Sequence, residues 1–413
     1  MRTLVLMLLS GLLLLTTVVS GRAEVAGRVI DAHTGLPIAG ALVTADGVVV
    51  ATDRDGRFQL QAAAPTVAAR AVGYRRSQSV PPREELDIAL EPHTPKAIYL
   101  SGYGMASPLL SGRARDLLAS TELNALVIDV KGDRGQLSYR SDLEQPERVG
   151  AQKSVTLRDL PGLLAELQEQ QVYTIARLVV FKDLPLALAR PELAVRTAGG
   201  AIWRDREALA WADPFRPEVW DYNLAIAEEV ARLGFDEIQF DYVRFPDARG
   251  LRFSQPSTEA ARVAAISGFL QEARRRLAPY NVFIAADIFG YVCWNQGDTE
   301  IGQRLVDLAA AVDYLAPMLY PSGFQFGIPG YRNPVQHPGP IVLRSLQRAQ
   351  QRTGLPPLHF RPWLQAFRDY AFDGRSFAGA PLRAQIEAAE SFGAHGWMLW
   401  NPGNNYSREG LKD

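Results

Sequence analysis

The sequence has little cysteine and little histidine. Its 413 residues include one cysteine, Cys293, and five histidines. A single cysteine excludes an intramolecular disulfide and any zinc site built from cysteines. The histidines do not form the H-E-x-x-H spacing of hydrolytic zinc sites, because they are scattered over His33, His93, His337, His359 and His395. The sequence therefore predicts neither a bound metal nor another cofactor.

An excess of charge of either sign is also absent. Lys and Arg number 44 against 45 Asp and Glu, which gives a net charge of −1. Nucleic-acid-binding proteins usually carry a basic surplus or stripe, so no nucleic-acid partner is predicted. The hydrophobic fraction of 47% is ordinary for a globular protein with a large core.

Long apolar runs are confined to the N-terminus. Leu4 to Val19 is apolar apart from small residues, Arg2 precedes this run, and the small residues Gly21 and Ala23 follow it. This layout is typical of a signal peptide over residues 1–23 with cleavage after Ala23, and it predicts a secreted or periplasmic protein. An uncleaved anchor helix is the alternative. No other segment approaches about 18 apolar residues, so no membrane span is predicted for the mature protein.

Residues 24–92 show the short, regularly spaced strands of a small all-β domain, and this spacing favours an antiparallel sandwich. Turns rich in Asp and Gly separate the strands, and Asp53 and Asp55 fit such a turn. The segments GRVIDAHTGLPIAGALVTADG, TDRDGRFQL and AVGYRR resemble the carboxypeptidase regulatory-like domain. The resemblance implies a seven-stranded Ig-like sandwich without catalytic residues, and we expect a spacer or binding role.

Residues 96–413 alternate between strands and helices, and their length suits an α/β fold, the (β/α)8 TIM barrel. Eight apolar runs are the predicted strands: Ala97–Tyr103, Ala125–Val130, Tyr173–Phe181, Glu237–Phe245, Val282–Phe289, Tyr314–Tyr320, Phe360–Phe367 and Gly396–Trp400. The predicted amphipathic helices are Asp159–Gln170, Glu218–Leu233, Thr258–Leu277, Ile301–Ala310, Ile341–Arg352 and Pro381–Phe392. Few residues follow Trp400, so the last helix is short or absent, and the N-terminal domain is a candidate to cover the gap.

Polar side chains stand late in these apolar strands, at the end where TIM barrels carry their active sites. A carboxylate buried in such a strand is costly unless it is paired or used. We predict Asp241 of strand four and Asp287 of strand five as catalytic. The predicted substrate-binding residues are Asp129 and Lys131 of strand two, Arg177 of strand three, Gln239 and Arg244 of strand four, Tyr320 of strand six, Trp363 and Gln365 of strand seven, and Trp400 and Asn401 of strand eight.

Some of these residues have a plain structural alternative. Alternation along strand two places Asp129, Lys131 and Asp133 on one side of the sheet. Lys131 and Asp133 also fit solvated charges at the end of a strand. Arg177 and Arg244 could simply pair with the carboxylates, and such pairing would orient Asp241.

Two carboxylates facing a cleft are the minimum machinery for glycoside hydrolysis, one protonated and one ionised. Neighbouring strands lie about 4.8 Å apart, so Asp241 and Asp287 at similar heights would approach the roughly 5 Å separation of retaining enzymes. An inverting geometry remains open. Aromatic residues at the strand ends, such as Tyr320, Trp363 and Trp400, would stack on pyranose rings. A carbohydrate is therefore the predicted substrate, and the oligomeric state is not predicted.

The stretch GFDEIQFDYVRFP, with VIDVKGDRGQL upstream and AADIFGY, APMLYPS and GWMLWNPGNNY downstream, resembles a glycosyl hydrolase family long classed as a domain of unknown function. Its strand-four motif is also similar to that of the alpha-amylase superfamily, and by that resemblance Asp241 is the nucleophile. The sequence departs from the amylase pattern in three places. Asp287 stands where a Glu acid is expected, Gln239 replaces an Arg, and Trp363 and Gln365 occupy the region of a His-Asp pair.

Two other functions remain open. A non-catalytic carbohydrate-binding barrel of the cell envelope would use the same cleft without turnover. A metal-dependent hydrolase or deacetylase would use Asp129, Asp133, Asp241 and Asp287 as oxygen ligands for magnesium or calcium.

Overall fold

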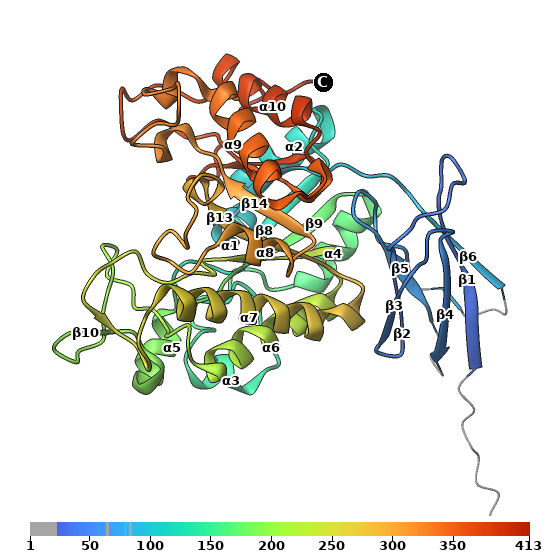
Figure 1. The fold of residues 1–413 in the computed structure, drawn as a ribbon, viewed down its shortest axis with the longest axis horizontal. Helices are drawn as coiled ribbons and strands as arrows, with labels where there is room; N and C mark the ends of the chain where they lie inside the picture. Colours follow the sequence, from blue (N-terminus) through green and yellow to red (C-terminus); the bar gives the residue numbers. More distant parts are fainter. Residues whose placement is uncertain (1–22, 63–65, 79, 82–84) are drawn as a thin grey trace, which may run out of the picture.

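The chain folds into a small all-β domain followed by a barrel ringed by helices (Figure 1). The computed structural model describes residues 23–62, 66–78, 80–81 and 85–413. The predicted signal peptide, residues 1–23, lies outside the described residues except for its last residue, Ala23. Among the helices of the described residues, none has the length and apolar character needed to cross a membrane.

The N-terminal domain is a sandwich of two three-stranded sheets, with strand orders β4–β1–β6 and β3–β2–β5. Buried apolar side chains from both sheets, such as Val29, Val43 and Ile88, form its core. The described part holds six strands rather than seven, and β1 pairs with β6 in parallel, so the expectation of a purely antiparallel sandwich is wrong. The strands are β1 (Ala23–Asp31), β2 (Leu42–Ala45), β3 (Val48–Ala51), β4 (Arg57–Ala62), β5 (Ala68–Arg70) and β6 (Glu85–Leu90).

Eight parallel strands close the barrel, which confirms the predicted TIM-barrel fold. Several strands end earlier than predicted. β11 stops at Asp241 because Tyr242 adopts a φ of 48°, a left-handed conformation that no strand contains. In barrel order the strands are β7 (Lys96–Leu100), β8 (Ala125–Lys131), β9 (Tyr173–Val179), β11 (Glu237–Asp241), β13 (Phe283–Phe289), β14 (Tyr314–Met318), β15 (Trp363–Gln365) and β16 (Trp397–Trp400).

Amphipathic helices surround the barrel and bury their apolar faces against the strands. The predicted Ile301–Ala310 helix is shorter than expected, because Asp298 accepts backbone hydrogen bonds from Glu300 and Gly302 in a turn. The helices are α1 (Gly102–Ala106), α2 (Pro108–Ser120), α3 (Glu144–Arg148), α4 (Leu160–Glu169), α5 (Leu184–Ala189), α6 (Pro217–Leu233), α7 (Glu259–Leu277), α8 (Leu305–Ala309), α9 (Pro338–Thr353) and α10 (Ala380–Phe392). A two-stranded sheet, β10 (Arg196–Thr197) with β12 (Leu251–Arg252), joins the loops after β9 and β11.

No helix follows β16 in the described chain, and the C-terminal tail takes its place. The Tyr406 hydroxyl donates to the Tyr99 carbonyl oxygen at 2.8 Å, and the Glu122 amide donates to the Lys412 carbonyl oxygen at 2.9 Å. The tail thereby seals the seam between β16 and the start of the barrel. The idea that the N-terminal domain covers this gap is wrong.

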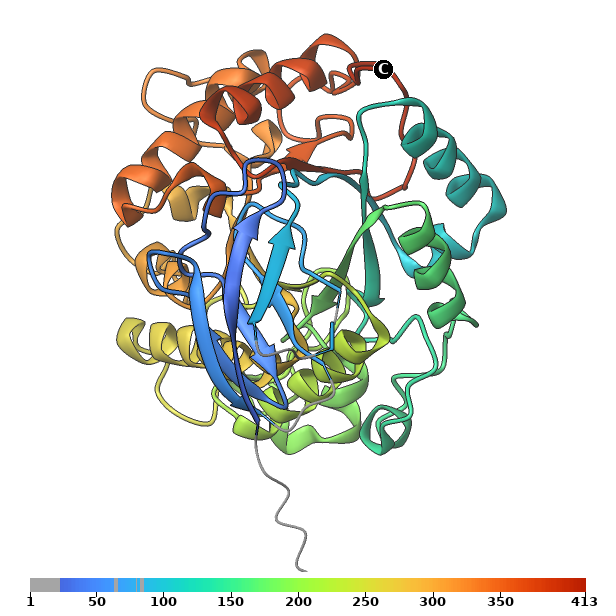
Figure 2. The same cartoon turned by 90° about the vertical axis from the view of Figure 1, so that its right-hand side faces the viewer.

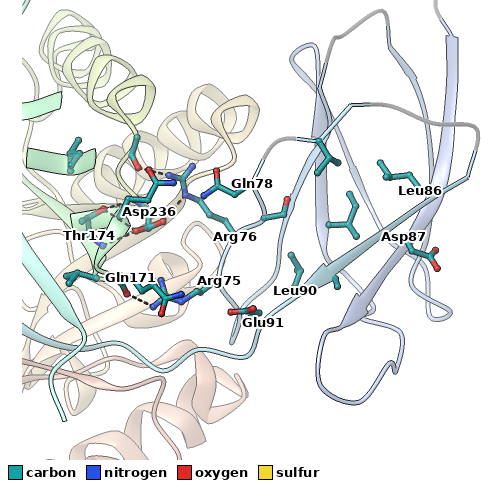
Figure 3. A pocket seen from close by; sticks show the side chains of 18 residues that line it. Arg75, Arg76, Gln78, Leu86, Asp87, Leu90, Glu91, Gln171, Thr174 and Asp236 are labelled. Carbon is teal, nitrogen blue, oxygen red and sulfur yellow. Dashed lines mark hydrogen bonds and ion pairs between the residues drawn. The ribbon is translucent and has the colours of Figure 1, made fainter. Parts of the chain in front are cut away.

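The N-terminal domain instead covers the end of the barrel where the strands begin (Figure 2). Val72 packs against the apolar cluster inside the barrel. Arg75 donates to the Gln171 carbonyl oxygen at 2.8 Å, and Arg76 pairs with Asp236 at 2.9 Å. These residues line a cavity of about 550 Å³ between the two domains (Figure 3). The domain therefore closes one end of the barrel and leaves the other end free.

The barrel interior contains a buried ion pair near this closed end. Arg361 donates to the two carboxylate oxygens of Glu237 at 2.7 and 2.8 Å, and each side chain is at most 1% exposed. The Tyr173 hydroxyl donates to the same carboxylate at 3.0 Å, and Arg361 also donates to the His395 carbonyl oxygen at 3.0 Å. Burial raises the pKa of Glu237, and the charge of Arg361 opposes that rise.

We expect Arg361→Met to lower the free energy of unfolding by about 3–5 kcal/mol, because it leaves the Glu237 carboxylate buried without its partner. Urea denaturation of the purified protein measures this change. The double variant Glu237→Gln, Arg361→Met also removes the unpaired carboxylate and should recover part of the lost free energy of unfolding. Equal losses in the single and double variants would show that the ion pair itself does not matter.

Candidate active site

A cavity of about 170 Å³ opens at the end of the barrel where the strands finish. It is smaller than the roughly 300–1,000 Å³ of typical ligand pockets, so it would hold only a small part of an extended substrate. Residues from six strands or the loops that follow them line the cavity: Arg177, Asp241, Tyr242, Arg244, Phe289, Met318, Tyr320, Trp363 and Trp400.

Arg177 is the centre of the polar groups in this cavity. Its guanidinium donates to Asp241 Oδ2 at 2.6 and 2.9 Å, to Asp129 Oδ1 at 2.7 Å and to Asp133 Oδ1 at 2.8 Å. The Arg177 side chain is only 1% exposed. One cation therefore fixes three carboxylates from the ends of β8 and β11 and from the loop after β8. Charge-assisted bonds of this kind are stronger than neutral ones.

Strand register explains why these groups meet. Arg177 on β9 pairs with Asp129 on β8 and with Gln239 on β11, so all three side chains point to the same side of the sheet. The Tyr99 hydroxyl donates to Asp129 Oδ2 at 2.6 Å. Burial raises the pKa of Asp129 to about 6, although Arg177 opposes this effect.

Asp241 ends its strand in a tight turn. Its Oδ1 accepts a hydrogen bond from the Tyr242 amide at 2.6 Å, while Oδ2 faces Arg177. Both oxygens are therefore held, and the left-handed φ of Tyr242 comes directly after the carboxylate. Strained backbone of this kind concentrates at functional sites. The Asp241 carboxylate therefore lines the cavity in a fixed orientation.

Asp287 is 1% exposed and does not line the cavity, although it contacts the lining residue Trp363. Trp363 Nε1 donates to its Oδ1 at 2.7 Å, and Oδ2 has no hydrogen-bond partner among the described residues. Burial, and next the negative charge of Asp241, raise the pKa of Asp287 well above its usual value. Asp287 therefore favours the protonated form while its neighbour Asp241 is held by a cation.

Arg244 does not form an ion pair with any described carboxylate. Its guanidinium lies over the rings of Trp211, Tyr242 and Phe289, with centroid distances of 4.6–5.0 Å. Contact with aromatic faces stabilises the cation. Because Arg244 also lines the cavity, it can offer hydrogen bonds to a ligand.

Five of the predicted substrate-binding residues do not line the cavity. Asp129 contacts it only through its ion pair with Arg177. The prediction that Lys131 shares the face of Asp129 is wrong, because a β-bulge between these two residues reverses its direction. Lys131 pairs instead with Asp183 at 2.6 Å, and both side chains are fully buried. Gln239 lies deeper in the barrel and contacts Met398.

Gln365 and Asn401 hold loops at the rim. Gln365 accepts a hydrogen bond from the Ser322 amide at 3.0 Å and donates to the Ser322 hydroxyl at 2.7 Å. Asn401 donates to the carbonyl oxygens of Ala366 and Asn405 at 2.7 and 2.8 Å. Both residues therefore shape the loops after β15 and β16 and leave the cavity to Tyr320, Trp363 and Trp400.

The sequence did not identify Tyr99 as part of the site, and it favoured a solvated charge for Asp133. Asp133 lies in the Gly-containing loop after β8 and accepts a hydrogen bond from Arg177. Tyr99 is an inward residue of β7 that stacks on Trp400 with ring centroids 4.1 Å apart. Its inward position in an alternating strand was the available signal. No group of three Asp, Glu, His or Cys side chains within the described ranges is placed to hold a metal ion, because Asp129, Asp133 and Asp241 surround Arg177.

Comparisons with solved structures show a shared fold. The glycoside hydrolase domain of PgaB (BpsB) from Bordetella bronchiseptica is 16% identical, with a TM-score of 0.53 over 76% of this chain and 95% of that one. The beta-galactosidase from the psychrophilic Marinomonas ef1 is 10% identical, with a TM-score of 0.53 over 74% of this chain and 54% of that one. A hypothetical protein from Ruminiclostridium thermocellum ATCC 27405 is 37% identical over 46% of this chain and 96% of its own, with a TM-score of 0.42. A search of curated proteins found no match.

Family models match both parts of the chain. Residues 24–91 match the carboxypeptidase regulatory-like domain. Residues 97–406 match a family described as "Putative glycosyl hydrolase domain", and this match covers most of the chain. The chain, whose barrel carries its cavity at the end where TIM-barrel enzymes work, therefore belongs to this glycosyl hydrolase family.

Proposed function

We propose that the protein is a glycoside hydrolase that cleaves an oligosaccharide or polysaccharide, with Asp241 and Asp287 as its carboxylate pair. The proposal rests on the different surroundings of these two carboxyl groups. Asp241 forms an ion pair with Arg177, whereas burial, and next the negative charge of Asp241, raise the pKa of Asp287 well above its usual value. Glycoside hydrolysis needs one ionised and one protonated carboxyl group.

Strand register supports a retaining mechanism. Phe240 pairs with Ala286 between β11 and β13, so Asp241 and Asp287 come next on adjacent strands, which lie about 4.8 Å apart. Retaining enzymes place their two carboxyl groups about 5 Å apart. In this scheme Asp241 attacks the anomeric carbon and Asp287 gives its proton to the leaving oxygen. Arg244 and the rings of Tyr320, Trp363 and Trp400 would position the sugar.

We also propose that the reaction takes place outside the cytoplasm. The support is the apolar run from Leu4 to Val19 with the small residues that follow it, which is typical of a signal peptide. Amino-terminal sequencing of protein from the culture medium or periplasm would test this location, and a first residue at Glu24 is expected.

We expect Asp241→Asn to lower the rate of glycan hydrolysis by about 10³-fold, because the amide can neither attack nor carry the charge that Arg177 holds. Mature wild-type protein is first screened against envelope polysaccharides and exopolysaccharides by release of reducing ends. Asp116→Asn on the exposed face of α2 is the matched control and should keep full activity. Unchanged turnover by folded Asp241→Asn would contradict the assignment, and glycan binding without turnover in the wild type would favour a binding protein instead.

The raised pKa of Asp287 gives a pH-dependent prediction. A group whose pKa is higher in the folded state contributes stability at low pH, and this stability is lost as the pH rises through the folded pKa. Asp287→Asn resembles the protonated group at every pH. We therefore expect wild type and variant to unfold at similar urea concentrations near about pH 4, and the variant to be the more stable at about pH 8. The variant should also lose glycan hydrolysis, and equal pH dependence of stability in the two proteins would argue against a protonated Asp287.

A further inference from the structure

An exposed tyrosine stands on the loop between β15 and α10, two ring contacts away from the cavity. Tyr370 is 65% exposed, and its position has no role in the packing of the barrel core. Large exposed apolar side chains that occur singly need no explanation. Tyr370 differs from such cases because its ring is connected to the cavity and its loop is rigidly held.

Two ring contacts lead from the cavity to Tyr370. Tyr320, which lines the cavity, meets Phe367 edge to face at a centroid distance of 5.4 Å. Phe367 in turn stacks on Tyr370 at 6.1 Å, with an angle of 11° between the ring planes. Three aromatic rings therefore form a continuous path from the cavity to solvent, and their contacts favour a fixed geometry.

A buried carboxylate holds this loop in place. Asp369 is 5% exposed and accepts hydrogen bonds from the amides of Ala371, Phe372, Asp373 and Gly374 at 2.7–3.1 Å. The Ser322 hydroxyl donates to Asp369 at 2.6 Å, and these bonds hold the pKa of Asp369 well below its usual value despite partial burial. Gln365 binds Ser322 in turn. The loop after β15 is thus tied to the loop after β14, and Tyr370 is presented without a large loss of entropy on binding.

A second cavity lies beside Phe367, the middle ring of this path. Its volume is about 250 Å³, and Phe367, Arg368 and Asn401 belong to its lining. Arg368 is exposed and forms no ion pair with the described residues, so its donors are free for hydroxyl groups. The first cavity alone is small, and the contact between Tyr320 and Phe367 links it to this second cavity.

We infer that Tyr370 and Phe367 form an outer carbohydrate subsite, and that the substrate is a chain of several sugars extending over the loop between β15 and α10. The inference rests on the proposed glycoside hydrolase function and adds that binding energy is drawn from sugars beyond the one at Asp241. Tyr370 would stack on the apolar face of a pyranose ring. Its removal should therefore affect long substrates and spare short ones.

The test compares Tyr370→Ala, Tyr370→Phe and wild type on nitrophenyl glycosides of N-acetylglucosamine, glucose and galactose, as monosaccharides and as β-1,4-linked tetrasaccharides. For a tetrasaccharide that is cleaved, Tyr370→Ala should raise KM about five- to tenfold, the value of one lost stacking contact, with kcat nearly unchanged. The monosaccharide constants should not change, and Tyr370→Phe should behave as wild type because the ring remains. Tyr103→Ala is the matched control, since Tyr103 is also 65% exposed and forms no ring contact within the described chain, and it should leave KM unchanged.

The possible failures can be told apart. Cleavage with the same tetrasaccharide KM in Tyr370→Ala and wild type would overturn the outer subsite and leave the hydrolase function intact. If no glycoside is cleaved, calorimetric titration of the tetrasaccharides replaces KM. Binding that weakens in Tyr370→Ala would then keep the subsite and contradict the hydrolase function, and absence of binding by every tetrasaccharide would overturn the subsite.

Discussion

The barrel and its cavity depend on one constraint, which is that two arginines pair with carboxylates on the inward face of β11. β11 points Glu237, Gln239 and Asp241 into the barrel, which is an unusual row of polar groups for a core. Arg361 neutralises the first of them near the closed end, and Arg177 neutralises the last at the open end. A buried carboxylate without a partner would destabilise the fold by several kcal/mol. The strand can carry its catalytic candidate only because cations from β9 and from the segment just before β15 reach across the interior.

The two ends of the barrel have separate tasks. At the end where the strands begin, the N-terminal domain packs through Val72, Arg75 and Arg76 and completes the core. At the other end, the loops are tied to each other by Ser322, Gln365 and Asp369 and surround the cavity. This division is usual for TIM barrels, in which stability and chemistry occupy opposite faces.

The sequence was sufficient to predict the two domains, the eight strands and the carboxylates at the strand ends. Apolar runs and alternation carry that information directly, and Asp129, Arg177 and Asp241 meet as their strand positions require. Alternation failed at Lys131, because a bulge of one residue reverses the side of the sheet and has no sequence signature here. The partners of Arg361 and Asp369 could not be predicted either. Glu237 lies far from Arg361 in the sequence, and the amides that bind Asp369 are brought together only by the fold of its loop.

The position of the N-terminal domain has a consequence for the orientation of the cavity. This domain packs against the end of the barrel where the strands begin (Figure 1), whereas the cavity lies at the end where they finish, so the two ends of the molecule differ chemically and sterically. Anything joined to the first domain, whether an envelope surface or another chain, would lie at the end of the barrel opposite to the cavity. The cavity would then point outward, away from its support, and a long glycan could approach it without meeting the surface that carries the protein.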